Sequence, residues 1–218
     1  MSRTNQAKEP VPSAAGHETD GRRRRGTTSR ARIVEALLEL VREGNPSPGA
    51  AQVARLAGVG LRTVFRHFED MDSLYREMGE TIQAHVLPAV FRPYSATGWR
   101  ERLEELLDRR VEAYEFIMPF KVSGELRRFQ SAYIARDAEQ HLELEKTSLL
   151  AVLPREVVDD PALLNALLAL SGFQAWRVLR QDLKLDVAAA RAAMRRGIDA
   201  MLGSAAGAAA REERGPTK

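Results

Sequence analysis

The chain has 218 residues, with 33 lysines and arginines against 30 acidic residues, a length that can enclose one substantial core or two smaller ones. It contains no cysteine, which excludes disulfides, thiolate nucleophiles and cysteine-ligated zinc, and its four histidines are too scattered for a local metal motif. No run reaches the roughly 18 apolar residues of a membrane span, and the first thirty residues lack an apolar signal core, so we expect a cytoplasmic protein without a membrane partner. We expect no metal and no cofactor.

The first 26 residues mix proline, glycine, serine and charge without periodicity. Such a composition buries too little apolar area to offset chain entropy, so we expect residues 1–26 to form a disordered arm. Four consecutive arginines stand near its end: Arg22, Arg23, Arg24 and Arg25. The run would suit a minor groove or a phosphate ridge, and it would equally suit a solubilising tail or a cloning remnant.

Two helices are predicted next. Residues 27–29 can cap the first, whose apolar stripe runs from Ile33 to Val41 and ends at Gly44. After a proline-rich turn, apolar residues at helical spacing, Leu56 among them, predict the second helix over residues 51–57.

A glycine turn leads from the second helix to a third one. Gly58 can take the positive φ that a sharp turn needs, and residues 61–68 then resume an apolar face through Leu61, Val64 and Phe68. Two helices around such a turn form a helix-turn-helix motif.

The opposite face of the third helix offers hydrogen-bond donors to solvent. They are Arg62, Thr63, Arg66 and His67. These residue types suit guanine edges and phosphate oxygens in a major groove. An ordinary all-α domain with a solvated basic face would show the same pattern.

A fourth helix is predicted from residue 70. Asp70 can cap it, and an apolar stripe from Leu74 to Val86 runs until Pro88. Free backbone N–H groups at the start of this helix, at Asp70 and Met71, could contact a phosphate.

Two long helices follow a break at residues 89–98. One runs from Trp99 through Ile117 into Phe120, and a second, bent stretch covers residues 125–153. Their aromatic residues could wall a pocket or could simply be core.

Two unusually apolar helices close the chain. One opens at Pro161, capped by Asp159 or Asp160, and ends near Leu183, and the other covers residues 187–202. Together they have more apolar face than one core needs, which indicates a partner subunit.

Residues 29–78 resemble the DNA-binding region of TetR-type transcriptional regulators. The resemblance rests on Gly58-Val59-Gly60, on Phe65-Arg66-His67-Phe68, and on Asp70-Met71-Asp72-Ser73-Leu74. Three positions depart from the family pattern: Phe65 replaces a tyrosine that reaches a phosphate, Met71 replaces a phosphate-contacting lysine, and Gly60 replaces a capping serine.

The resemblance implies an all-α fold, with an N-terminal three-helix helix-turn-helix domain over residues 27–72, a helical-bundle ligand-binding and dimerisation domain over residues 73–203, and a disordered tail over residues 204–218. It implies a homodimer, most often a repressor in this family, that binds a palindromic operator in double-stranded DNA. A small-molecule effector, hydrophobic if aromatic residues line its site, would release the DNA, with the fourth helix transmitting the change.

The implied site residues fall into three groups. Besides the arginine run, the DNA contacts would come from Gly60, Leu61, Arg62, Thr63, Phe65, Arg66, His67 and Met71. The effector contacts would come from His85, Tyr114, Ile117, Phe129, Tyr133, Phe173 and Trp176, although His85 could equally be a surface or core histidine. The last two helices would hold the dimer through Leu164, Leu168, Trp176, Met194 and Ile198.

Two other functions compete with this interpretation. A helical enzyme would need a nucleophile, base or metal arrangement, whereas Glu112, Glu115, His85 and His141 show no such spacing, so we expect no enzyme activity. An architectural DNA-binding protein would need no apolar pocket.

Overall fold

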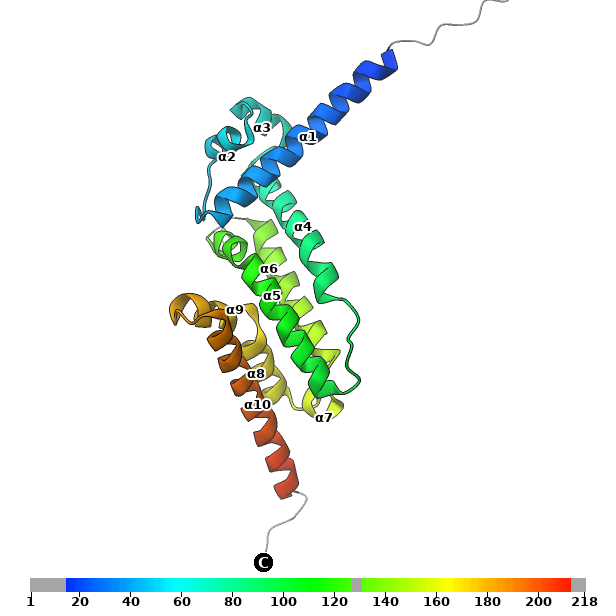
Figure 1. The fold of residues 1–218 in the computed structure, drawn as a ribbon, viewed down its shortest axis with the longest axis vertical. Helices are drawn as coiled ribbons and strands as arrows, with labels where there is room; N and C mark the ends of the chain where they lie inside the picture. Colours follow the sequence, from blue (N-terminus) through cyan, green and yellow to red (C-terminus); the bar gives the residue numbers. More distant parts are fainter. Residues whose placement is uncertain (1–14, 127–130, 213–218) are drawn as a thin grey trace, which may run out of the picture.

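The computed structural model describes residues 15–126 and 131–212, with side chains over residues 28–126 and 131–204. Within that part of the chain every regular element is a helix, which confirms the predicted all-α fold (Figure 1). The helices are α1 (Ala15–Arg42), α2 (Ala50–Ala57), α3 (Leu61–His67), α4 (Met71–Val90), α5 (Trp99–Glu125), α6 (Ala132–Leu150), α7 (Arg155–Val158), α8 (Pro161–Ser171), α9 (Phe173–Arg177), the π-helical turn η1 (Val178–Asp182) and α10 (Val187–Glu212).

Helices α1, α2, α3 and the first half of α4 enclose one core at one end of the molecule (Figure 1). Val53 and Ala54 of α2 and Val64 of α3 are buried in it, together with Phe68. Gly58 ends α2 in the left-handed conformation, with φ 63° and ψ 41°, and the amide of Val59 donates to the carbonyl of Ala54 over 3.0 Å. The predicted helix-turn-helix is therefore present, with the predicted glycine at its turn.

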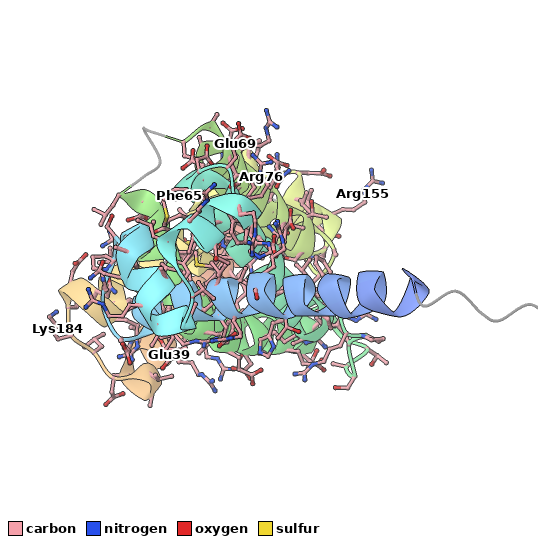
Figure 2. All side chains as sticks on the ribbon, turned by 90° about the horizontal axis from the view of Figure 1, so that it is seen from above. Glu39, Phe65, Glu69, Arg76, Arg155 and Lys184 are labelled. Atoms are coloured by element: carbon pink, nitrogen blue, oxygen red, sulfur yellow. The ribbon has the colours of Figure 1, made fainter. Side chains whose placement is uncertain are left out.

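Helix α1 begins earlier than the sequence indicated. Its backbone is helical from Ala15, whereas residues 15–26 were expected to belong to a disordered arm, so that expectation is wrong for them. Arginine favours helix, no proline lies between Pro12 and Pro46, and extending an existing helix is easier than nucleating one. The N-terminal half of α1 projects past the other helices (Figures 1 and 2), and it contains residues 22–25.

Two prolines lie inside helices, and one of them, Pro88, was expected to end its helix. Helix α4 continues through Pro88 to Val90, and the amide of Phe91 still donates to the carbonyl of Leu87 over 2.9 Å. Helix α5 continues through Pro119 to Glu125. A proline removes one intrahelical hydrogen bond, and packing against neighbouring helices can outweigh that loss.

Helices α4, α5, α6, α8, α9 and α10 form the helical body below this domain (Figure 1). Its core contains Leu106, Leu107, Leu149, Leu167 and Trp176. The body and the helix-turn-helix domain share α4, whose first half belongs to one core and whose Ile82 packs against both.

The single helix expected from Pro161 to Leu183 is broken at Gly172, between α8 and α9, and the two parts are bent by 43°. A Cβ at Gly172 would lie 3.0 Å from the carbonyl oxygen of Leu168 and 3.2 Å from Glu145 Oε2, so any larger residue would be tightly packed where α6 approaches the break. Helix α10 also continues to Glu212, past the tail expected from residue 204.

Among the described helices, none alone is long and apolar enough to cross a membrane. Only the bent pair of Pro161–Ser171 and Phe173–Asp182, taken together, has a suitable length and composition. Its Leu167, Phe173 and Trp176 are buried in the core of the helical body.

Candidate nucleic-acid interface and internal cavity

Helix α3 buries two of its three predicted inward residues. Val64 and Phe68 are buried in the core, whereas Leu61 is 46% exposed, so its predicted inward position is wrong. Leu61 is the first residue of this seven-residue helix, where the core that covers Val64 no longer reaches. Leu56 of α2, predicted on an apolar face, is also 49% exposed.

The outward face of α3 carries most of the predicted donors. Arg62 and Arg66 are exposed and Thr63 is half-buried. Phe65, labelled in Figure 2, is 49% exposed, so its ring is open to a partner. Gly60 is the exposed N-cap residue of α3 and offers no side-chain hydrogen bond to it.

His67 differs from its neighbours on α3, because it is half-buried. Its Nε2 atom is buried and has no hydrogen-bond partner among the described residues. Burial, and after it the charges of Arg66 and Arg30, lower the pKa of His67. Its buried Nε2 is therefore not exposed for a contact with DNA.

Arg30 of α1 joins the end of α3 to α4. It donates from Nη1 to the carbonyl of His67 over 2.5 Å and from Nε to Glu77 Oε1 over 3.0 Å. Its guanidinium carbon also lies 4.3 Å from the centre of the Phe68 ring, within the range of a cation–π contact. These contacts fix the orientation of α3 relative to the helix that leads into the body.

Asp70 caps α4 as predicted. The amide of Ser73 donates to Asp70 Oδ1 over 2.8 Å, and this hydrogen bond lowers the pKa of Asp70. Met71, the first residue of the helix, is half-buried and packs against the core of the helix-turn-helix domain. Because its side chain packs against that core, the groups available to a phosphate are the backbone N–H groups at the start of α4.

A cavity of about 760 Å³ lies between α4, α5 and α6, and Phe173 and Gln174 of α9 close one end. Four residues predicted as effector contacts line it: Tyr114, Ile117, Tyr133 and Phe173. Phe129 lies outside the described residues.

Two further predicted effector residues are not in the wall. The exposed ring of His85 stacks on Phe116 with 4.6 Å between ring centres. Trp176 is fully buried and donates from its indole nitrogen to Glu115 Oε1 over 2.8 Å. Neither residue therefore lines the cavity: His85 stacks on Phe116 at the surface, and Trp176 is covered by core.

A buried polar cluster closes the cavity at the end nearest α8. Arg110, only 3% exposed, donates from Nη1 to the carbonyl and hydroxyl oxygens of Ser171, over 3.2 and 2.6 Å. From Nη2 it donates to the carbonyl oxygen of Glu145 and, over 3.0 Å, to Ser148 Oγ. The guanidinium thus ties α5 to α6 and α8.

The carboxylate of Glu145 lies beside this cluster, and the residue is 8% exposed. Its Oε1 accepts hydrogen bonds from the Tyr114 hydroxyl over 2.6 Å and from the Phe173 amide over 2.8 Å. His141 Nε2 lies 3.2 Å from the same oxygen but outside hydrogen-bonding geometry.

Burial alone would raise the pKa of Glu145, yet the contacts of His141, Tyr114 and Phe173 hold it below its usual value. Burial raises the pKa of Tyr114 well above its ordinary value. The end of the cavity therefore holds a carboxylate that is charged near neutral pH, beside a phenol that keeps its proton.

Neither Arg110 nor Glu145 was predicted from the sequence as a site residue. A signal was present at Arg110, because a charged residue stands there on the apolar stripe between Leu107 and Val111 of α5. Glu145 carried a weaker one, four residues after His141 and four before the buried Leu149. Neither spacing identifies the distant partners, which lie 28 to 61 residues away in the sequence.

Three of the predicted dimer contacts are buried within the single chain. Trp176, Met194 and Ile198 have 2% exposure or less and belong to the core of the body, so they cannot form an interface as predicted. Leu164 and Leu168 are half-buried against the same core. The stripe read from the sequence was the inward face of α10, and the outward face carries Ala192, Ala193 and Arg196.

Among the described residues, no group of three or more His, Asp or Glu side chains is placed to hold a metal ion.

No protein-family model matches this chain, and no curated protein matches its sequence. Among solved structures, it is similar to a transcriptional regulator from Rhodococcus sp. Rha1, with a TM-score of 0.61 and 18% identity over 80% of this chain and 96% of that one. It is also similar to the multidrug binding protein EbrR, solved with imidazole, with a TM-score of 0.51 and 21% identity over 78% of this chain and 89% of that one. At these identities the likeness shows a shared fold: an all-α chain with a helix-turn-helix domain and a helical body.

Proposed function

We propose that this chain is a ligand-responsive transcriptional regulator, a repressor of the TetR type, that acts in the cytoplasm. As a homodimer it would bind a palindromic operator through α3 and release it when a small molecule occupies the cavity of the body. One observation carries this proposal: a helix-turn-helix with an exposed basic α3 is joined through α4 to a body that encloses about 760 Å³.

The DNA-binding part rests on the exposed face of α3. Arg62 and Arg66 are both exposed and neither is taken up by an ion pair among the described residues, so their guanidinium groups are free to reach guanine edges or phosphates. Thr63 and the Phe65 ring lie beside them. Helix α3 would enter the major groove, as second helices of this motif do. The arginines of residues 22–25, in the projecting part of α1, would add phosphate contacts outside the groove.

The effector part rests on the cavity. Its volume falls within the roughly 300–1,000 Å³ of small-molecule sites, and its wall combines aromatic residues with a few fixed polar groups. The neighbouring structures agree with this division of labour, since one is described as a transcriptional regulator and the other as a multidrug binding protein. Both are regulators or binding proteins rather than enzymes, which favours a non-catalytic use of the cavity.

The dimer part rests on the outward faces of α8 and α10. These faces carry small exposed residues, among them Ala162, Ala169, Ala192 and Ala193, which would let two copies approach closely. An isologous pairing of two helices from each chain would match the twofold symmetry of a palindromic site.

The test is a DNA-binding measurement with matched variants. A duplex selected from a randomised pool by the wild-type protein serves as the operator, and affinity is measured for the operator and for a scrambled duplex. The R62A/R66A variant should lose most of its preference for the operator, by roughly 1–3 kcal/mol for each bidentate base contact. R155A, which removes an exposed arginine from α7, at the end of the molecule opposite α3 (Figure 1), should bind like the wild type.

Unchanged preference in the double variant would contradict the assignment of α3 as the reading helix. For the dimer, A169D and A193E should yield monomers by sedimentation velocity and weaken operator binding, and a monomeric wild type at micromolar concentration would contradict the homodimer. An operator complex that no small molecule dissociates would favour an architectural DNA-binding protein.

A further inference from the structure

From the geometry of Glu145 we infer that the cavity takes an organic cation, an apolar body carrying a protonated nitrogen that donates to Oε2 of this carboxylate. The inference deepens the proposed function, because it names the chemical class of the effector, and it rests on the effector part of that proposal.

The two oxygens of Glu145 are used unequally. Oε1 accepts from the Tyr114 hydroxyl and the Phe173 amide, and His141 lies beside it. Among the described residues no donor contacts Oε2. A buried carboxylate gains from every hydrogen bond to its charged form, so an open oxygen on the wall of a cavity is a place for a ligand's N–H group.

The buried cation in the same wall is not available to an anionic ligand. Arg110 directs both terminal nitrogens at protein oxygens, two on Ser171, one on Ser148 and the backbone carbonyl of Glu145. These four contacts use all four N–H bonds of the two terminal nitrogens. None of them uses the Glu145 carboxylate, whose negative charge is therefore not directly paired with Arg110.

The cavity wall as a whole carries net negative charge, like Glu145 itself. Five carboxylate side chains and three lysine or arginine side chains line the cavity, so negative charges exceed positive ones by two when His141 is neutral and by one when it is protonated. Lys121 is moreover paired with Asp137 at 3.0 Å. An anion entering this cavity would meet net repulsion, whereas a cation would be attracted along its way in.

Aromatic rings surround the carboxylate. The Tyr114 and Phe173 rings lie edge to face with 5.7 Å between their centres, and the His141 ring lies 6.2 Å from Phe173. Ring faces attract a desolvated cation, and the apolar wall accepts the rest of its body. A carboxylate among three rings thus favours an amine or amidine on an apolar frame over a neutral compound of the same shape.

The experiment compares three probes that differ only in their head group: 4-phenylbutylamine, 4-phenylbutan-1-ol and 5-phenylpentanoate. Binding to the full-length protein is measured by isothermal titration calorimetry at pH 7, without DNA. We expect the amine to bind at least tenfold more tightly than the alcohol and the carboxylate to bind most weakly. This series needs no variant, so a folding defect cannot obscure it.

Two variants then locate the effect. In E145Q the amide oxygen can still accept from Tyr114 and Phe173, but the charge is gone, so the preference for amine over alcohol should fall to about one. E112Q removes one charge from an exposed position of α5 outside the cavity wall and should keep the wild-type preference. Thermal unfolding followed by circular dichroism checks that both variants are folded.

Equal affinity for amine and alcohol, tighter binding of the carboxylate, or no binding of any probe up to millimolar concentration would overturn the inference. So would a preference for the amine that survives in E145Q. Failure of this inference can be distinguished from failure of the proposed function. If the amine binds but does not weaken the operator complex, the cation site stands and the effector role of the cavity is contradicted. If only neutral compounds release the operator, the effector role stands and the cation site is contradicted.

Discussion

Arg110 should be among the most destabilising single positions to change in the helical body. The R110M variant keeps much of the apolar stem and removes the guanidinium that joins α5 to α6 and α8. Its two terminal nitrogens make four hydrogen bonds, and bonds from a charged donor contribute about 1.5–3 kcal/mol each before the cost of burying the charge. That desolvation cost, several kcal/mol, offsets part of the sum.

The expected net loss is about 3–5 kcal/mol, the range found when one partner of a buried charged network is removed. Some acceptors find substitutes: the two serine hydroxyls can rotate, and the Tyr114 hydroxyl already lies 3.2 Å from the carbonyl of Ser171. R110K retains the charge but gathers its donors on one nitrogen, which cannot span α6 and α8 together, so we expect it to recover only part of the loss.

The assay is urea unfolding at a fixed protein concentration, because the stability of a dimer depends on that concentration. R155M serves as the control, since it removes an exposed arginine from α7, outside the proposed dimer faces, and should change the free energy of unfolding by less than about 0.5 kcal/mol. A loss below about 1 kcal/mol for R110M, or a full recovery in R110K, would refute the view that the forked guanidinium joins these helices.

Three further outcomes follow from local contacts. Hydrogen bonds from the side chain and backbone of Ser95 lower the pKa of Glu105 from 4.5 to about 2. In urea titrations, the stability difference between wild type and E105Q should therefore be constant above about pH 5 and shrink as the pH falls from 4.5 towards 2. A difference that grows towards low pH would contradict this. G58A should destabilise the protein by about 1–2 kcal/mol, because φ is +63° and the new Cβ would lie 2.7 Å from Arg32 Nη2. G203A, in open space on α10, should instead stabilise it slightly. Equal effects of the two variants would refute this explanation. Deleting residues 1–26 should flatten the dependence of log affinity on log salt by about 0.9 per lost phosphate contact, and an unchanged slope would make the arm passive.

The helix-turn-helix domain could be predicted from the sequence because its contacts are local. The turn at Gly58 is made by residues within four positions of it, and the apolar spacing of Val64 and Phe68 gives the direction in which both side chains point. The same pattern misplaced Leu61, since whether a helix end is covered depends on the position of another helix. Local periodicity gives the direction of a side chain, and the surrounding fold decides whether anything lies there.

The cavity and the C-terminal helices could be predicted only in outline. The break at Gly172 is shaped by Glu145, whose carboxylate accepts the amide of Phe173 from 28 residues away in sequence. The dimer stripe was misread for a related reason: Met194 and Ile198 repeat at helical spacing whether a helix faces its own chain or a partner. The N-terminal boundary was missed because a polar, arginine-rich segment reads as disordered by composition yet continues an existing helix.

The position of the cavity bears on how an effector would act on DNA binding. Tyr75, Met78 and Phe120 line the cavity and also belong to the core of the helix-turn-helix domain, so a ligand that displaces them would act on that core directly. Helix α6 presses on α4 at the next turn, where the Tyr133 hydroxyl donates to the carbonyl of Arg76 over 3.3 Å and would lie 2.6 Å from a Cβ at Gly79.

A tenfold loss of operator affinity requires only about 1.4 kcal/mol of difference between two states. That is the size of one hydrogen bond or one altered side-chain contact. Breaking the hydrogen bond between Tyr133 and α4 would therefore suffice, if it tilts the helix that begins three residues after Phe68. Because Arg30 binds both the end of α3 and Glu77 of α4, such a tilt would be carried to the reading helix rather than absorbed between the two.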